Sequence, residues 1–513
     1  MTRSWRPWAV LLSISSGLLL AAAGDPLGLA PVAWVALAPL YVAIMKERRR
    51  RWSALYGFVA GVAYFSIHLS WIFLFGWMAF VALVAVMSSW WALAGVLTGV
   101  VRRLPLAPVL AAGIFSTAEL LRDRVPWGGF GWGTPGLSQV AVPVVRGLAP
   151  AVGATGLTFL VAFAGAVLAD RLLTRHLPWA SLMLVSAVLV LFIGVDALRY
   201  GSPDAGEPVR VAVVQGNVPR PVLPSWSEQR EAVVRGHEEL TRTLVGRADV
   251  DLVVWGEDAI GEVVTDGLDR ASALARTLGT PMVVGRSEVV PERNGFYNVM
   301  DHIDASGRVV DTYAKRHPVP FGEFVPLGFL RRFVTTLDQV PYDMLRGEEW
   351  VVFDVRTRSG RVGVATPICF ESVFARDVRA LARRGAEVMV YSTNDSSFER
   401  TFASEQHLTH VRMRAAELRQ WGVQAAISGH SALVDPNGVV IERSPLFVPT
   451  VVEGVVQARA ASSLYARVGD LFAWGWTAGS GLALALYALV LARGRRPVEQ
   501  VEDRTQPMAP VEG

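Results

Sequence analysis

Long apolar segments are the feature that most constrains how this chain can fold. Seven occur before residue 200 and an eighth near the C-terminus, at residues 7–23, 26–45, 53–76, 78–101, 105–121, 147–169, 178–198 and 471–492. About 20 apolar helical residues cross the hydrocarbon core of a bilayer. Hydrophobic residues make up 52% of the chain and charged residues only 18%, which is more apolar than a soluble domain. The sequence therefore predicts a polytopic membrane protein with about eight transmembrane helices.

Basic clusters predict how these helices are oriented. Arg and Lys gather before the first segment and after each of segments two, four, six and eight, in "MTRSWRP", "KERRRR", "RR", "DRLLTRH" and "RGRRP". Loops rich in Arg and Lys remain in the cytoplasm. Both termini are therefore expected in the cytoplasm of a cell membrane, with the region between segments seven and eight outside. We interpret the first segment as an uncleaved anchor, although its basic start and small residues also fit a signal peptide.

The region from residue 201 to about 464 shows a different pattern. Short β-branched runs bounded by turn residues predict buried strands, at residues 209–217, 251–255, 281–285, 361–370, 387–394 and 421–428. Helical spacing separates several of them, at residues 227–246, 269–279, 372–385 and 404–420. This alternation predicts an α/β domain, and the turn Asp435-Pro436-Asn437-Gly438 predicts a hairpin and hence a mixed sheet.

The expected organisation follows from these two patterns. A membrane domain with the first seven transmembrane helices is predicted at residues 1–200, the α/β domain at residues 201–464, and the last transmembrane helix at residues 465–496. The polar, Pro-containing segment 497–513 is predicted to be a disordered cytoplasmic tail. The formal net charge of +4 is too small to predict a nucleic-acid partner.

Three residues stand out in the α/β region. Cys369, the only cysteine, lies at the carboxyl end of an apolar strand and just before a helix pattern, where open α/β sheets place catalytic groups. Lys315 is one of only two lysines in a chain that otherwise uses Arg. Glu257 follows the predicted strand at residues 251–255. Each also has a purely structural interpretation: Cys369 as a packed thiol, Lys315 as a surface cation and Glu257 as a helix-capping carboxylate.

Taken in order, Glu257, Lys315 and Cys369 resemble the Glu-Lys-Cys triad of the carbon-nitrogen hydrolase (nitrilase) superfamily. Combined with eight membrane spans, the chain resembles the apolipoprotein N-acyltransferases over almost its full length. The local matches are "VVQGNVP", "YAKRHPVPFGEFVP", "ICFES", "STNDSSF" and "HLTHVRMRAAEL", with a looser match in "AELLRDRVPWGGFGWGTPGLSQ". The resemblance implies an extracytoplasmic αββα sandwich of the nitrilase type between the seventh and eighth transmembrane helices.

The resemblance also implies a reaction. An acyl chain would pass from a membrane phospholipid through a Cys369 thioester to the α-amine of a diacylglyceryl-cysteine at a lipoprotein N-terminus. Residue chemistry assigns the proton transfers to Glu257, and oxyanion stabilisation to Lys315 and the backbone N–H of Phe370. Three positions that match the family complete the expected site, with Glu323 and Glu371 in supporting roles and Trp226 on the substrate side.

Alternatives remain open for several of these residues and for the whole chain. Glu371 could only hold loops, and Trp226 could only cap a helix. His407 and His410, three residues apart, favour packing or a surface position over ligation, and no metal or cofactor is expected. The same triad would serve a membrane-tethered amidase, in which water resolves the thioester. A transporter or scaffold is disfavoured, because only His68 and Glu119 are candidate ionisable groups within the spans.

Overall fold

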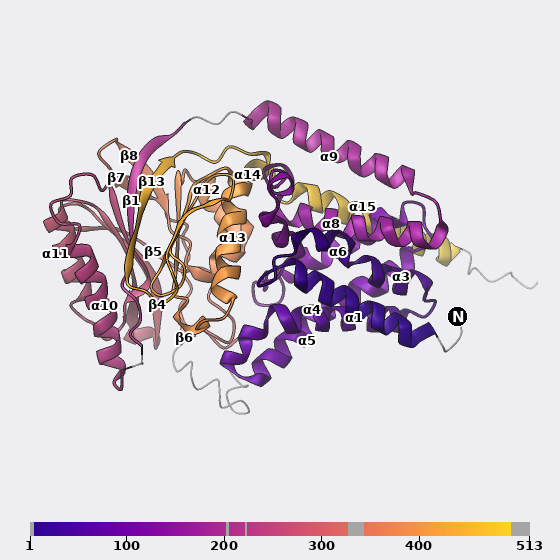
Figure 1. Ribbon diagram of the computed structural model, residues 1–513, viewed down its shortest axis with the longest axis horizontal. Coiled ribbons are helices and arrows are strands. Elements are labelled where there is room, and N and C mark those ends of the chain that lie inside the picture. Colours follow the sequence, from indigo (N-terminus) through magenta and orange to yellow (C-terminus); the bar gives the residue numbers. More distant parts are fainter. Residues whose placement is uncertain (1–4, 202–204, 221–222, 327–342, 494–513) are drawn as a thin grey trace, which may run out of the picture.

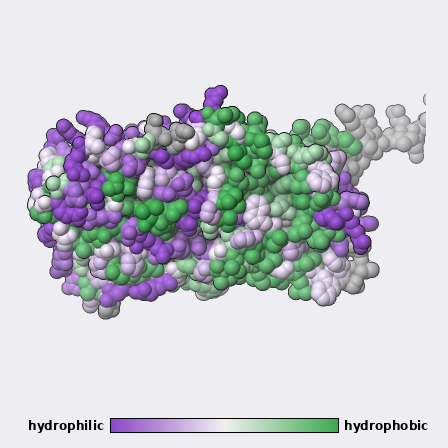
Figure 2. Space-filling model, turned by 45° about the horizontal axis from the view of Figure 1, so that its top comes forward, coloured by the Kyte–Doolittle hydropathy of each residue, from purple (hydrophilic) through white to green (hydrophobic). Residues whose placement is uncertain are grey.

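In the computed structural model, which describes residues 5–201, 205–220, 223–326 and 343–493, a bundle of apolar helices adjoins a domain built on two β-sheets (Figure 1). Hydrophobic residues gather over the helical half of the surface, and hydrophilic residues over the other half (Figure 2). This separation is the one expected when one half lies in lipid and the other in water. The predicted tail at residues 497–513 lies outside the described residues.

Every apolar segment of the sequence contains helix in the structure. The helices of this half are α1 (Trp5–Ala23), α2 (Ala33–Ala36), α3 (Ala38–Lys46), α4 (Arg50–His68), α5 (Trp77–Val101), α6 (Ala107–Arg122), α8 (Ala149–Thr174), α9 (Trp179–Tyr200) and α15 (Leu471–Arg493). Two short helices, α7 (Pro143–Arg146) and α14 (Leu464–Val468), lie in the connections.

Not all of these helices have the length and composition of a membrane span. Among the described residues, five are long and apolar enough: α1, α5, α8, α9 and α15. α6 has only 16 residues, α4 begins with two arginines, and the second segment is divided into short pieces between Ala30 and Lys46. Several apolar helices that could cross a membrane are thus confirmed, whereas the number of eight spans stays a prediction.

A buried ion pair lies at the end of α6. The Arg122 guanidinium donates from Nη2 to Glu119 Oε2 at 2.7 Å, and neither side chain is more than 1% exposed. Its Nη1 donates to the carbonyls of Phe130 and Trp132 at 2.6 and 2.8 Å, while Trp91 Nε1 donates to Glu119 Oε1 at 2.9 Å. Glu119, a candidate for transport in the sequence, is therefore paired, and its partner fixes the backbone of the loop after α6.

The other half contains two β-sheets, one of seven strands and one of six. Sheet one has the order β13-β1-β2-β3-β4-β5, with β6 paired to β4, and consists of β1 (Glu207–Gln215), β2 (Leu252–Ile260), β3 (Met282–Val290), β4 (Gly295–Ile303), β5 (Val309–Ala314), β6 (Asp343–Met344) and β13 (Thr450–Ala458). Sheet two has the order β12-β11-β10-β9-β8-β7, with β7 (Phe353–Arg356), β8 (Arg361–Ala365), β9 (Val388–Thr393), β10 (Gly422–Ala426), β11 (Ala432–Val434) and β12 (Val440–Arg443).

Both sheets mix parallel and antiparallel pairs, as the sequence predicts. The β1-β2-β3 and β8-β9-β10 pairs are parallel, whereas β11 and β12 form the expected antiparallel hairpin. β4, β5, β6, β7 and β13 were not predicted. The three longest of them, "GFYNVMDHI", "VVDTYA" and "TVVEGVVQA", carry polar residues inside the run, so they lack the uninterrupted apolar pattern of the central strands.

Alternation along the strands produces four layers. Val211 and Val213 of β1 enter the apolar core between the two sheets, whereas Ala212 and Val214 face outward. The outer face of sheet one packs on α10 (Trp226–Arg242) and α11 (Gly267–Leu278), and that of sheet two on α12 (Ala375–Ala382) and α13 (Ala403–Leu418). The predicted α/β domain is confirmed, as an αββα sandwich.

Helix α13 joins this sandwich to the helical half. In Figure 1 it lies between the two. Trp132 Nε1 donates to Gln406 Oε1 at 2.7 Å, and Gln406 Nε2 donates to the carbonyl of His68 at 3.1 Å. At the kink of α8, where Gly153 has a φ of 69°, the Ala154 N–H donates to Glu417 Oε1 at 2.7 Å. The two halves are therefore held by directed hydrogen bonds as well as by apolar packing.

Replacing Arg122 tests the importance of the buried pair. Arg122→Ala leaves the Glu119 carboxylate buried without its cation and frees two backbone carbonyls, so the free energy of unfolding is expected to fall by about 3–5 kcal/mol. Denaturant unfolding of the purified protein in detergent measures this, with Arg103→Ala, an exposed arginine after α5, as the control. Equal stability of the two variants would contradict the structural role of the pair.

Candidate active site

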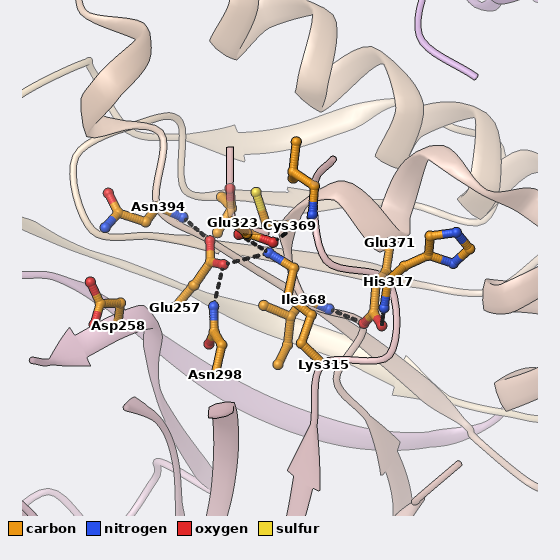
Figure 3. Close-up of polar contacts among 12 residues, drawn as sticks. Glu257, Asp258, Asn298, Lys315, His317, Glu323, Ile368, Cys369, Glu371 and Asn394 are labelled. Atoms are coloured by element: carbon orange, nitrogen blue, oxygen red, sulfur yellow. Dashed lines mark hydrogen bonds and ion pairs between the residues drawn. The ribbon is translucent and has the colours of Figure 1, made fainter. Parts of the chain in front are cut away.

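Lys315 lies at the centre of a buried polar cluster, immediately after β5. Its side chain is 0% exposed, and Nζ donates to Glu257 Oε1 at 3.0 Å and to Glu323 Oε1 at 2.6 Å (Figure 3). Its own N–H donates to the carbonyl of Asn298 at 2.8 Å, which continues the pairing of β5 with β4. Burial alone would lower the Lys315 pKa, but the two carboxylates raise it well above its ordinary value, so the group is an ammonium.

Glu257 lies inside β2, and not beyond its end as the sequence predicted. The strand continues to Ile260, but its pairing with β3 shifts register between Trp255 and Ile260, and Asp258 within this stretch has a φ of 57°. Such an irregularity redirects side chains at a sheet edge. The Glu257 carboxylate accepts from Asn298 Nδ2 at 2.6 Å, from Lys315, and from the Asn394 N–H at 2.7 Å.

Cys369 begins a short 3₁₀ helix, Cys369–Val373, after Ile368 makes a bridge to Ser392. The cysteine is half-buried and has a φ of 50°, a conformation that non-glycine residues adopt only where surrounding contacts impose it. Its sulfur lies with the Lys315 and Glu323 side chains in Figure 3. The N–H groups at the start of a helix lack partners within it, so the Phe370 N–H is suited to an external acceptor.

The thiol is protonated at rest. Burial raises the pKa of Cys369 well above its ordinary value, and the Glu257 carboxylate raises it further, while the Lys315 ammonium lowers it without overcoming these effects. The N-terminal N–H groups of a helix can favour a thiolate, but here burial dominates. Attack by this sulfur therefore requires a base that removes its proton as the bond forms.

Glu371 and Glu323 support this arrangement from either side. The buried Glu371 carboxylate accepts from the N–H groups of Ile368 and Arg316, both at 2.7 Å, and from the Tyr313 hydroxyl at 3.0 Å. It thereby ties the end of β5 to the loop that carries the cysteine, which favours the loop-holding interpretation. Burial and the neighbouring Glu257 raise the pKa of Glu323, and the Lys315 ammonium opposes them.

Trp226 lies at the start of α10, beside the capping residue Ser225, and is 57% exposed. Its indole Nε1 donates to Glu262 Oε1 at 2.9 Å, and the Arg230 guanidinium lies 4.4 Å from the ring centroid. These contacts fit the interpretation of Trp226 as part of a helix start, and its place on the substrate side stays a prediction.

The sequence did not identify two groups that bind Glu257. Asn298 was missed because β4 was not predicted, and the backbone N–H of Asn394 carries no sequence signal of its own, although "STNDSSF" was recognised as a motif. Among the described residues, no group of three or more His, Cys, Asp or Glu side chains is arranged to hold a metal ion.

The chain matches two family profiles. Residues 16–167 match the apolipoprotein N-acyltransferase N-terminal domain, and residues 210–464 match the carbon-nitrogen hydrolase family. The apolipoprotein N-acyltransferase of Geobacter metallireducens is 32% identical, covering 93% of this chain and 94% of that protein. That of Methylococcus capsulatus is 30% identical, covering 97% and 98%. Saccharomyces cerevisiae Nit3, of the nitrilase superfamily, superposes on 52% of this chain and 96% of its own, at 18% identity and a TM-score of 0.38.

The high thiol pKa can be tested by alkylation. Since only the thiolate reacts, the rate of carboxamidomethylation of Cys369 by iodoacetamide should rise about tenfold per pH unit up to at least about pH 9. Intact mass spectrometry gives the rate without ambiguity, because the chain has a single cysteine. Glutathione is the exposed-thiol control, and a plateau for the protein at a lower pH than for glutathione would contradict the effect of burial.

Proposed function

This chain belongs to the apolipoprotein N-acyltransferase family, and from that premise we propose that Cys369 is the nucleophile that carries the acyl chain as a thioester. The chain is an acyltransferase that N-acylates lipoproteins. We propose a phospholipid as the donor and the α-amine of a diacylglyceryl-cysteine as the acceptor. The observation that carries the assignment of the site is the fully buried Lys315, held between Glu257 and Glu323 beside the only thiol of the chain.

In the first half of the proposed cycle, Glu257 takes the proton of the Cys369 thiol while the sulfur attacks an ester carbonyl of the phospholipid. The carbonyl oxygen becomes an oxyanion, which Lys315 Nζ and the Phe370 N–H stabilise, each donor contributing about 3–4 kcal/mol in comparable enzymes. The C–O bond then breaks, and Glu257 returns its proton to the departing lysophospholipid alcohol. The acyl group remains on sulfur.

In the second half, the acceptor amine attacks the thioester carbonyl and Glu257 takes the proton that the nitrogen loses. The same two donors hold the oxyanion, the C–S bond breaks, and the proton passes to the sulfur, which restores the thiol. An N–C bond has replaced the C–S bond, so the amide product leaves with no net change in the enzyme. Glu323 orients Lys315 in both halves, and Glu371 holds the loop of the nucleophile.

The position of the site at the boundary between the two halves of the molecule supports lipid substrates. Phe370, next to the nucleophile, packs against Phe130 of the helical half, with ring centroids 5.5 Å apart. Withdrawing an acyl chain from lipid costs about 0.8 kcal/mol per CH₂, so the thiol must lie near the bilayer. From the basic loops we further propose eight spans, with the sandwich on the extracytoplasmic side of the cell membrane and both termini in the cytoplasm.

Incubation with phospholipid alone tests the covalent step. The purified chain should gain one acyl mass that hydroxylamine removes, and Cys369→Ala should gain none, because the thioester forms on sulfur. Added diacylated lipopeptide should then discharge the adduct as N-acylated product. An equal adduct on Cys369→Ala would refute the mechanism. Discharge at the same rate in buffer without an amine would instead favour a membrane-tethered amidase.

Lys315→Arg tests the oxyanion donor. A guanidinium is planar and broader than an ammonium, so in this enclosed position it should displace one of its two carboxylates or the oxyanion. Acylation should slow by about 10²–10³, the usual effect of losing one such donor. The matched control is Lys46→Arg, which changes the only other lysine of the chain, on α3. Wild-type acylation by Lys315→Arg would remove Lys315 from the mechanism.

A further inference from the structure

His407 of α13 contacts the backbone of the nucleophile. Its ring is 1% exposed, and Nε2 lies 3.1 Å from the Cys369 carbonyl oxygen and 2.9 Å from Ser372 Oγ. Nδ1 lies 2.9 Å from Asp395 Oδ1, an oxygen that also accepts from the Thr393 hydroxyl. Neither contact was expected from the sequence, which assigned His407 to packing or the surface.

Both hydrogen bonds of the ring require it to be charged. The Cys369 carbonyl oxygen and the Asp395 carboxylate can only accept, so keeping a bond to each requires N–H groups on both Nε2 and Nδ1, with Ser372 Oγ as a second acceptor for Nε2. A neutral ring would keep only one of the two bonds. An imidazole with two N–H groups is the cationic imidazolium. Burial lowers the pKa of His407, but the charge of Asp395 and its hydrogen bond outweigh burial and leave the pKa above its ordinary value. Geometry and electrostatics therefore agree on a charged ring.

The Cys369 carbonyl belongs to the same peptide group as the Phe370 N–H. A hydrogen bond to the oxygen of a peptide group withdraws electron density from its nitrogen, which makes the N–H a stronger donor. A cation at the oxygen has a larger effect than a neutral donor, because charge-assisted hydrogen bonds are about twice as strong. A positive charge on His407 therefore acts at the oxyanion position through one peptide group.

We propose that His407 is a positioning residue that, as an imidazolium held by Asp395, polarises the Cys369–Phe370 peptide group and so strengthens its N–H as the oxyanion donor. The same bond holds the carbonyl of Cys369, whose backbone has a φ of 50°. The inference rests on the proposed function, since it needs an oxyanion on the Phe370 N–H. It adds a charge to the oxyanion site that does not touch the substrate.

The surroundings of the ring suit this role. Trp132 of the helical half and Phe398 pack on the imidazole ring, with ring centroids 5.7 and 6.5 Å away, and shield it from water. Besides Asp395, the charged and titratable groups that act on it are Glu257, which raises its pKa, and His410, one turn further along α13. Low polarity around the pair increases the effect of its charge on the neighbouring peptide.

The first experiment compares two reactions of the same sulfur in His407→Gln. Glutamine keeps a neutral N–H donor but removes the charge. Acylation by phospholipid, which forms an oxyanion, should slow by about tenfold or more. Alkylation by iodoacetamide forms none, and should stay within about threefold because it follows the thiolate fraction alone. The matched control is His410→Gln, a buried histidine on the same helix, which should acylate within about threefold of wild type.

The second experiment uses pH and does not depend on the His407 variant folding. In Asp395→Asn the ring loses the carboxylate that keeps it charged, so burial lowers its pKa and the imidazolium is lost as pH rises. Because burial places the pKa of the variant's ring below its ordinary value of about 6.5, the ratio of the Asp395→Asn acylation rate to that of wild type, each divided by the alkylation rate at the same pH, should fall as the pH rises from about 5 to about 6.5. A purely structural defect would give a ratio independent of pH.

The outcomes separate this inference from the proposed function. Absence of a Cys369 adduct in the wild type would refute the proposed function, and the inference with it. A wild-type adduct that forms equally fast in His407→Gln would overturn only the inference. So would an equal slowing of acylation and alkylation in that variant, or a pH-independent ratio for Asp395→Asn.

Discussion

The site depends on keeping one ammonium group, that of Lys315, entirely out of water. A buried charge is tolerated only when opposite charges and hydrogen bonds surround it, and Glu257 and Glu323 supply both. The carboxylates need partners in turn, which for Glu257 are the Asn298 amide and the Asn394 N–H. These partners come from β4 in one sheet and from the loop after β9 in the other. The packing of the two sheets against each other thus brings together the groups that stabilise the buried Lys315 ammonium.

Helix α13 connects this polar cluster with the helical half of the molecule. Leu408 and Val411 pack on sheet two, whereas Met413 and Ala416 belong to the apolar core of the helical half. Near the start of the same helix, Gln406 accepts from Trp132, whose carbonyl in turn accepts from the buried Arg122. The loop after α6 and the backbone of the nucleophile therefore contact the same helix, α13.

How much the sequence predicted depended on whether a feature was local. Strand and helix patterns identified the α/β domain, and the rarity of Cys369 and Lys315 pointed to both residues. Position could not be predicted where it arises from pairing between distant segments. The register shift that places Glu257 inside β2 depends on β3, and the missed partner Asn298 lies on a strand whose polar residues hid its pattern. The number of spans stayed open for a similar reason, because packing against neighbours allows short helices in the bundle.

The protonated thiol explains how such a cluster can operate beside lipid. In the proposed cycle every proton moves between Cys369, Glu257 and the reacting group of the substrate, so the net charge of the cluster stays constant through both halves. A dry site could not readily compensate a gain or loss of charge, because ions in low dielectric are strongly destabilised. What changes is the location of the negative charge, which moves from Glu257 toward the oxyanion position. Lys315 lies where this displaced charge arrives, and by our inference the imidazolium of His407 acts on the same position through the Cys369–Phe370 peptide group.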